Sequence, residues 1–357
     1  MTNLKPTKIT YDFIDSLRFI SMFGIVMEHS SFFFGAKFAT FNEKIVQIFS
    51  LQFFKFGTII FFILAGFLIG DKFNTYSTKE YLKRRLDNTV KPWLFWVVTL
   101  FILNYIDIVV RNVKGGNSPF FNSKLADLVT DFGNIIFNTS FWFIPNFLIC
   151  IAILLLFRKY LYSIGFGICL LCLSLFYSVN LYFDIIPTSH TTALLGFIFY
   201  LWLGVQINKY YEKFKLIIQK TPVSLFALLT IITFMLSSLE SYYLLAKLPA
   251  DPFNTLRTTN IIYSLVCFAL LYKLGDRISL TKFKPSIYTF GIYLVHQILV
   301  FRLMPLIFRP LHIDFENRSA YYFLAVQLLS FAVVYSGSIL IVYLINKSER
   351  ARWIIGR

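Results

Sequence analysis

Two residues of the first apolar stretch, Arg18 and His29, are the strongest candidates for chemistry in this sequence. A charged side chain inside a membrane span is costly, so such residues usually face the interior of the helix bundle. Eleven residues at about 100° each return a helix to within about 20° of its starting direction, so both side chains project from one face, about 16 Å apart along the axis. Asp15, Met22 and Ile25 lie on or near that face. The stripe favours a reaction site over the alternative, an ion-pair network with a packing histidine.

Further polar residues are expected in one layer in the outer half of the membrane. At a rise of about 1.5 Å per residue, His29 lies about 20 Å from the inner surface of a core about 30 Å thick, and Lys55 and Asp107 about 22 Å. Lys55 and Asp107 could pair with each other. Arg302, Glu240 and Trp142 fall near the same depth, although snorkelling to the interface also explains Arg302 and Glu240. The layer predicts the acceptor side of a site, with His296 closer to the inner surface, at about 15 Å.

A basic cluster precedes the third apolar stretch, in the segment YLKRRLDNTVKP at 81–92. Its cations are Lys83, Arg84, Arg85 and Lys91. Clusters of this kind commonly set membrane topology, but arginine also recognises phosphates through paired hydrogen bonds. We therefore keep two interpretations, a topology signal and a binding site for an anionic cytoplasmic ligand. Pro92 is expected to open the helix that follows.

The elements that must position these residues are membrane helices. The 357 residues are 57% hydrophobic and only 15% charged, with 43 phenylalanines, and a soluble fold of this size could not cover so much apolar surface. We predict an all-α polytopic membrane protein, one domain over 1–357, with about ten spans because each needs about 20 apolar residues. The expected spans are 13–35, 47–70, 92–110, 141–157, 161–180, 191–208, 223–240, 259–274, 286–304 and 321–345. An amphipathic helix is expected near 123–137.

The distribution of Lys and Arg predicts the orientation. With the N-terminus inside, the inner segments carry 23 Lys and Arg and the outer loops 10, so both termini are expected in the cytoplasm. The net charge of +16 is scattered in short clusters, so we expect contact with the lipid bilayer and no nucleic acid. The four cysteines lie in apolar stretches and predict neither disulfides nor a metal site. No cleavable signal peptide is expected, because charged residues interrupt the first apolar stretch.

Five segments in order resemble the acyltransferase-3 family of bacterial integral-membrane O-acyltransferases. The opening YDFIDSLRFISMFGIVMEHSSFF has an Asp, an Arg three residues on and, after ten more residues, a His, here Asp15, Arg18 and His29. The other segments are FFILAGFLIG, RLDNTVKPWLFW, FWFIPNFL and YTFGIYLVHQ, the last containing Tyr293 and His296. Two positions depart from the family: Asn88 replaces the second Arg of the loop motif, and Ala65 replaces a Ser. Arg84 or Lys91 could substitute for that second Arg.

The resemblance implies a ten-span fold in a bacterial cytoplasmic membrane and transfer of an acyl group, usually acetyl, from cytoplasmic acyl-CoA to a hydroxyl of a surface glycan. Coenzyme A would be the donor substrate, and no tightly bound cofactor is expected. His29 would act as general base or carry the acyl group transiently, and Arg18 would hold the donor or stabilise negative charge. Glu28 is a weaker candidate to orient His29. Lys83, Arg84, Arg85 and Lys91 would bind the donor phosphates, and Tyr293 and His296 would line the cavity.

Two other functions stay open on the sequence. A transporter or flippase for a glycan or lipid-linked intermediate would need a polar path through the bundle and no dependence on coenzyme A. A catalytically inactive subunit would tolerate the loss of Arg18 and His29 together. The sequence does not specify the glycan or any protein partner.

Overall fold

The computed structural model describes residues 11–73, 77–114, 125–189, 191–247, 251–275 and 278–357, and every regular element in these ranges is helical. The first half contains α1 (Asp12–His29), α2 (Phe41–Gln52), α3 (Gly57–Phe73), α4 (Thr78–Arg85), η1 (Leu86–Val90), α5 (Lys91–Lys114), α6 (Leu125–Phe137), η2 (Ser140–Trp142), α7 (Phe143–Leu156), η3 (Arg158–Tyr160) and α8 (Ile164–Phe183). The second half contains α9 (Leu194–Lys209), α10 (Tyr211–Lys220), α11 (Val223–Leu245), α12 (Thr258–Gly275), η4 (Thr281–Phe283), α13 (Pro285–Ile298), η5 (Leu299–Leu303), α14 (Met304–Phe308), α15 (Ala320–Lys347) and η6 (Arg352–Ile355).

Every predicted span contains a helix, and α6 lies where the amphipathic helix is expected. Within the described residues, seven helical stretches are long and apolar enough to cross a membrane, or eight if the pair Asp127–Phe137 and Ser140–Leu156, bent by 74°, is one span. Two predicted spans fall outside this count. Helix α1 carries several charged residues, and α9 has only 16 residues. The total number of crossings and the orientation of the termini remain predictions.

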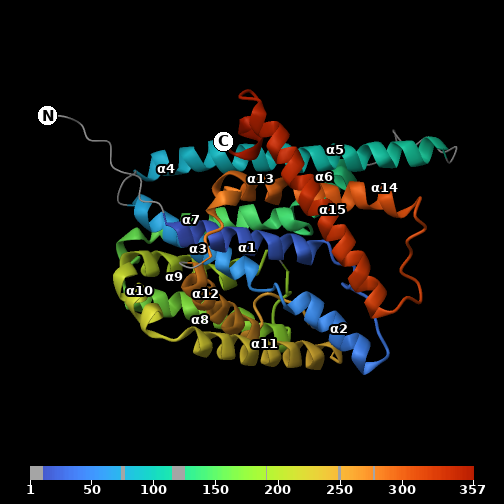
Figure 1. Cartoon of the computed structure of the whole chain (residues 1–357). Helices are drawn as coiled ribbons and strands as arrows, with labels where there is room; N and C mark the ends of the chain where they lie inside the picture. Colours follow the sequence, from blue (N-terminus) through green and yellow to red (C-terminus); the bar gives the residue numbers. More distant parts are fainter. Residues whose placement is uncertain (1–10, 74–76, 115–124, 190, 248–250, 276–277) are drawn as a thin grey trace.

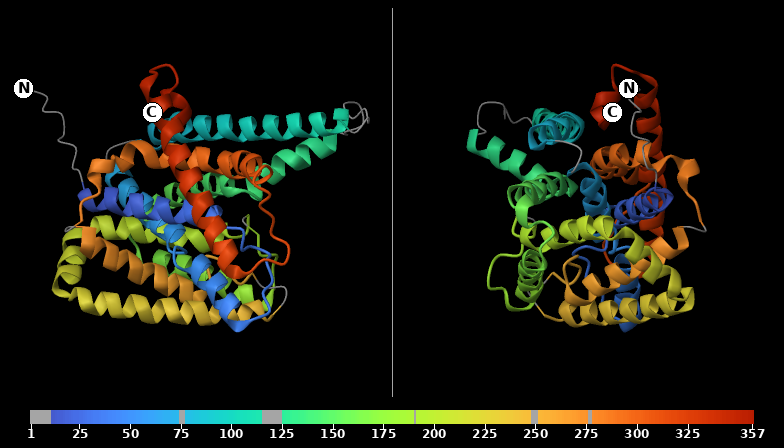
Figure 2. Two further views of the ribbon diagram at one scale, coloured as in Figure 1. Left: turned by 45° about the vertical axis from the view of Figure 1, so that its right-hand side comes forward. Right: turned by 90° about the vertical axis from the view of Figure 1, so that its left-hand side faces the viewer.

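Most of the long helices run roughly side by side in one bundle, and α15 crosses them at a steep angle (Figure 1). Helices α4 and α10 lie at one end, and α2 and α14 at the other. Helix α5 extends past the body of the bundle with α6 beside its far half (Figure 2). Exposed leucines, isoleucines and phenylalanines occur on the outside of the long helices, as expected where lipid solvates the bundle.

The closest helix contact is between α3 and α9, and glycine makes it possible. A Cβ atom on Gly66 would overlap the carbonyl oxygen of Leu201, and one on Gly204 would overlap that of Ile63. Small residues let membrane helices approach backbone to backbone, where van der Waals contact replaces the hydrophobic effect. This explains Gly66 in the segment FFILAGFLIG at 61–70. The contact forms the centre of the largest cluster of buried apolar side chains.

The basic segment is helical, which corrects the expectation of a loop. Ser77 and Glu80 form a capping box that starts α4, and η1 joins α4 to α5 without a break. Pro92 therefore lies inside a continuous helix. Both η1 and η5 are π-helical turns, and each ends two residues before a proline, Pro92 or Pro305. Because proline lacks an N–H and its ring crowds the preceding turn, a widened turn lets the helix continue past it.

A buried cation, Arg257, holds the C-terminal ends of α2 and α11 together. Its side chain is fully buried and donates hydrogen bonds to Ser241 Oγ (2.6 Å) and to the carbonyl oxygen of Ser237 (3.0 Å). It also binds Gln52 of α2 and lies 3.4 Å from the carboxylate of Glu240. Burial lowers the pKa of Arg257 to about 10, and the nearby Glu240 carboxylate opposes that shift. Arg257 therefore stays charged at neutral pH, and Glu240 is part of this network instead of snorkelling.

Candidate active site

Helix α1 places its polar stripe at a cavity of about 390 Å³, as the residue spacing predicts. Arg18, Met22, Ile25 and His29 all line it. Asp15 lies one turn below Arg18, with 3.5 Å between its carboxylate and the guanidinium. We call this space the histidine cavity. It follows α1 along most of its length, so a ligand inside it would contact both Arg18 and His29.

The remaining wall of the histidine cavity comes from segments that are far apart in the sequence. Helices α3, α7 and α13, the π turn η1 and the C-terminal segment all contribute. Besides α1, the polar and aromatic side chains of the wall include Thr58, Lys72, Arg85, Asn88, Thr89, Ser140, Trp142, Phe143, Thr289 and Tyr293. The cavity therefore extends from the basic end of the bundle, at Arg85, to the end of α1, at His29.

His29 is held by a second histidine. Its Nδ1 lies 2.9 Å from Nε2 of His296, and the two rings are nearly parallel, at 9°. His296 is fully buried, and its Nδ1 lies 3.1 Å from the carbonyl oxygen of Ile292. Since a carbonyl oxygen only accepts, Nδ1 of His296 carries the hydrogen and its Nε2 accepts from Nδ1 of His29. In the neutral pair, the lone pair of His29 is therefore on Nε2, which is the form a general base requires.

Tyr293 fixes the bend between α6 and α7. Its hydroxyl donates a 2.8 Å hydrogen bond to the carbonyl oxygen of Ser140, the first residue of η2. Trp142, two residues further on, lines the cavity. The Ser140 hydroxyl oxygen is buried and makes no hydrogen bond within the described part of the chain. The late motif YTFGIYLVHQ thus contributes one residue that shapes the wall and one that contacts His29.

Of the four cations predicted to bind the donor, Arg85 is the one that lines the histidine cavity. It donates a 2.8 Å hydrogen bond from Nε to the Tyr81 hydroxyl, and its guanidinium lies 5.7 Å from the centre of the Phe147 ring. Lys83 and Arg84 are exposed outside the lining. Lys91 is also exposed and pairs with Asp87 at 2.6 Å. The helical form of this segment spreads the four side chains around the axis, so they cannot share one cavity.

The polar layer has different partners from those expected. The predicted pair of Lys55 and Asp107 is wrong: Lys55 forms an ion pair with Glu28, and Asp107 forms one with Arg302. Depth along a helix axis does not specify which helices are neighbours. Glu28, the weaker candidate to orient His29, pairs with Lys55 instead, and His296 makes the contact with His29. Arg302, for which snorkelling to the membrane interface was the alternative, instead pairs with Asp107 at a second cavity.

Several residues at these sites were not anticipated from the sequence. Lys72 lines the basic end, and Asn88 lines the cavity at the position where the family has arginine. Gly356 reaches the same wall because η6 folds back onto α5, where Trp96 donates a 2.7 Å hydrogen bond to the carbonyl oxygen of Ile354. No periodicity marks these positions. In the residues that the structure covers, no cluster of three His, Cys, Asp or Glu side chains could hold a metal ion.

The fold and the site define a helical membrane protein in which a basic end leads along a cavity to His29 and its buried partner His296. Comparison with protein families agrees with this class. The acyltransferase-3 family model, described as an acyltransferase domain, matches residues 11–347. The chain therefore belongs to this family of membrane acyltransferases. No curated protein and no solved structure matches the chain.

Proposed function

We propose that this acyltransferase transfers an acetyl group from cytoplasmic acetyl-CoA to a carbohydrate hydroxyl of a cell-surface glycan, as a multi-pass protein of a bacterial cytoplasmic membrane. The observation that supports this most is the histidine cavity, which joins the cation Arg85 to His29. A long anionic donor would need such a route, because its charged end and its reactive end are far apart.

The donor would enter from the basic end. Arg85 and Lys72 line the cavity there, while Lys83 and Arg84 are exposed on α4, the helix that ends at Arg85, and add positive charge to the same segment of chain. Arginine and lysine bind phosphates, and converging cations raise the local concentration of an anionic ligand. The pantetheine arm of coenzyme A is about 20 Å long by extended-chain dimensions. It would pass Arg18 and bring the thioester to His29.

His29 is proposed to act as a general base. Its Nε2 would take the proton of the acceptor hydroxyl as that oxygen attacks the thioester carbonyl carbon. The carbon–sulfur bond then breaks, and the imidazolium returns the proton to the leaving thiolate. His296 would stabilise the imidazolium by accepting its Nδ1 hydrogen bond. In the alternative route, His29 Nε2 attacks the thioester and releases the thiol, and the acceptor oxygen then attacks the acyl-histidine, takes the acyl group and frees the imidazole.

Transfer of a labelled acetyl group tests this proposal. The full chain in lipid nanodiscs is given [14C]acetyl-CoA and envelope glycan extracted from a strain that lacks the gene. We expect alkali-labile label on the glycan with the wild type and none with His29→Ala. Label from succinyl-CoA instead of acetyl-CoA would correct the acyl group alone. No transfer from any acyl-CoA would contradict the proposal. The family match and the cavity give no support to the flippase alternative.

A further inference from the structure

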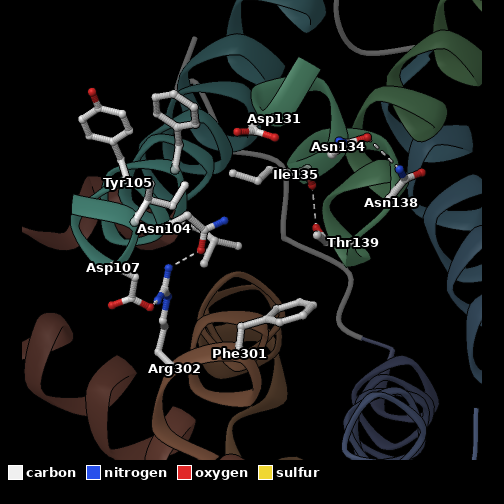
Figure 3. Close-up of a pocket in the computed structure, with 13 residues that line it drawn as sticks. Asn104, Tyr105, Asp107, Asp131, Asn134, Ile135, Asn138, Thr139, Phe301 and Arg302 are labelled. Carbon is white, nitrogen blue, oxygen red and sulfur yellow. Dashed lines mark hydrogen bonds and ion pairs between the residues drawn. The ribbon is translucent and has the colours of Figure 1, made fainter. Parts of the chain in front are cut away.

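A second cavity, of about 430 Å³, lies between α5, α6 and the π turn η5 (Figure 3). We propose that it is the binding site for the sugar acceptor. We call it the asparagine cavity, after the side chains that distinguish it from the histidine cavity. Figure 3 shows polar side chains from all three elements facing a common space. They are Asn104, Asp107, Asp131, Asn134, Asn138 and Arg302.

The chemistry of this lining fits a neutral, hydroxyl-rich ligand. Side-chain amides both donate and accept hydrogen bonds, carboxylates accept, and a guanidinium donates, so together they match sugar hydroxyls, which do both. Phe101, Tyr105 and Phe301 add aromatic surface, and ligand sites commonly combine such apolar walls with a few placed polar groups. Two carboxylates face one cation here, whereas Arg18, Lys72 and Arg85 line the histidine cavity. The asparagine cavity therefore disfavours phosphate.

Two side chains of the lining hold Arg302 in place at this cavity. Its terminal nitrogens bind Asp107 and Asn104, which orients the guanidinium (Figure 3). Its Nε is buried and has no partner in the described ranges of the chain. Asn134 and Asn138 are similarly set relative to each other by a 2.9 Å hydrogen bond.

Two segments of backbone contribute neighbouring residues to both sites. Thr139 lines the asparagine cavity, and the next residue, Ser140, lines the histidine cavity. On the other wall, Arg302 follows His296 by six residues, which is about 9 Å of helix rise. A sugar held by Arg302 and Asn134 would thus be one bend of the chain away from the histidine pair. This proposal rests on the proposed function and adds where the acceptor binds.

Acceptor kinetics test the inference. The double variant Asp131→Ala/Asn134→Ala removes two exposed side chains of the lining, and Asp127→Ala, an exposed residue one turn earlier on α6, serves as the matched control. Using [14C]acetyl-CoA and the extracted glycan, we expect the double variant to raise the glycan KM about tenfold, since each lost hydrogen bond weakens binding several-fold. The acetyl-CoA KM and the control variant should stay at wild-type values. The conservative Asn134→Gln variant should fall between them.

Each outcome has a distinct meaning. If the wild type labels no glycan, the proposed function fails, and the inference fails with it. If the wild type labels glycan and the double variant keeps the wild-type glycan KM, the asparagine cavity is not the acceptor site and the proposed function stands. A raised acetyl-CoA KM with an unchanged glycan KM would assign the cavity to the donor and overturn the inference.

Discussion

At the scale of single residues, the proposed role of His29 depends on which ring nitrogens of His29 and His296 carry hydrogen. These nitrogens form a hydrogen-bonded series that begins at the carbonyl oxygen of Ile292. The backbone carbonyl fixes the tautomer of His296, and His296 fixes that of His29. The spacing of Arg18 and His29 was readable from the sequence, because one helix turns by a known angle per residue. The contact between His29 and His296 was not, because it joins helices that are 267 residues apart in the chain.

Replacing His296 tests its role as a positioning residue. His296→Ala removes the acceptor of the His29 Nδ1 hydrogen bond, so we expect kcat to fall about tenfold to a hundredfold while the acetyl-CoA KM stays unchanged. His296→Gln offers an amide oxygen as acceptor and should recover part of the rate. His312→Asn, at an exposed histidine with positive φ, is the control and should behave as wild type. Equal rates in all three variants would show that His296 only fills space.

At the scale of helices, one buried ion pair ties the end of α1, at Glu28, to the turn between α2 and α3, at Lys55. The Lys55 side chain is 5% exposed and the Glu28 side chain 14%. Breaking such a pair leaves a buried charge and costs about 3 to 5 kcal/mol, whereas replacing both partners by apolar groups is close to neutral. We therefore expect Lys55→Met to lower the thermal midpoint in detergent and Lys55→Met/Glu28→Leu to recover most of it.

The exposed ion pair between Lys91 and Asp87 provides the comparison for the Lys55 and Glu28 variants. Its side chains are 59% and 42% exposed, so Lys91→Met should lower the thermal midpoint much less than Lys55→Met does. A double variant as unstable as Lys55→Met alone would show that Lys55 acts through packing and not through its charge.

The contact between α3 and α9 should tolerate no side chain. Gly204→Ala places a methyl group against the backbone of α3, which cannot move without separating the helices. We expect the yield of monodisperse protein to fall sharply, as measured by fluorescence-detected size-exclusion chromatography. Gly133→Ala on α6, where a Cβ meets nothing within 4 Å, should keep the wild-type yield. A normal yield for Gly204→Ala would mean that this packing is looser than described.

The π turns show what sequence patterns leave out at this scale. Pro92 was expected to open a helix, yet α4, η1 and α5 form one continuous stretch, and η1 contributes Asn88 and Thr89 to the histidine cavity. The other π turn, η5, contributes Phe301 and Arg302 to the asparagine cavity. A proline is normally read as a helix boundary, and only the three-dimensional path shows that a widened turn carries the helix past it.

At the scale of the whole molecule, hydropathy predicted which segments are helical, because burial in lipid acts on each helix separately. It did not predict which helices touch. That choice depends on small residues such as Gly66 and Gly204 and on buried cations such as Arg257, which lies in the short connection between α11 and α12. The sequence pointed to residues of the histidine cavity on α1 and to Arg85, Trp142 and Tyr293, but not to how their helices meet, and it pointed to the asparagine cavity only through Asp107 and Arg302.

The predicted orientation can be measured by labelling. In a variant whose four cysteines are replaced by alanine, Lys83→Cys should react with a membrane-impermeant maleimide only after the membrane is opened. His312→Cys should react in intact cells, since the excess of Lys and Arg places residue 83 inside and residue 312 outside. Both positions are exposed, so each reaction reports the side of the membrane. The reverse pattern would invert the topology and move the donor entrance to the outside.

We propose above all that His29 catalyses the transfer of an acyl group to a surface glycan. The most direct test is the ester-linked acyl content of envelope glycans, measured by mass spectrometry in a deletion strain complemented with the wild type or with His29→Ala at matched expression. We predict that the wild type restores an acyl ester and that His29→Ala does not. If both restore the ester equally, or if neither changes acylation while glycan export changes, the account is contradicted.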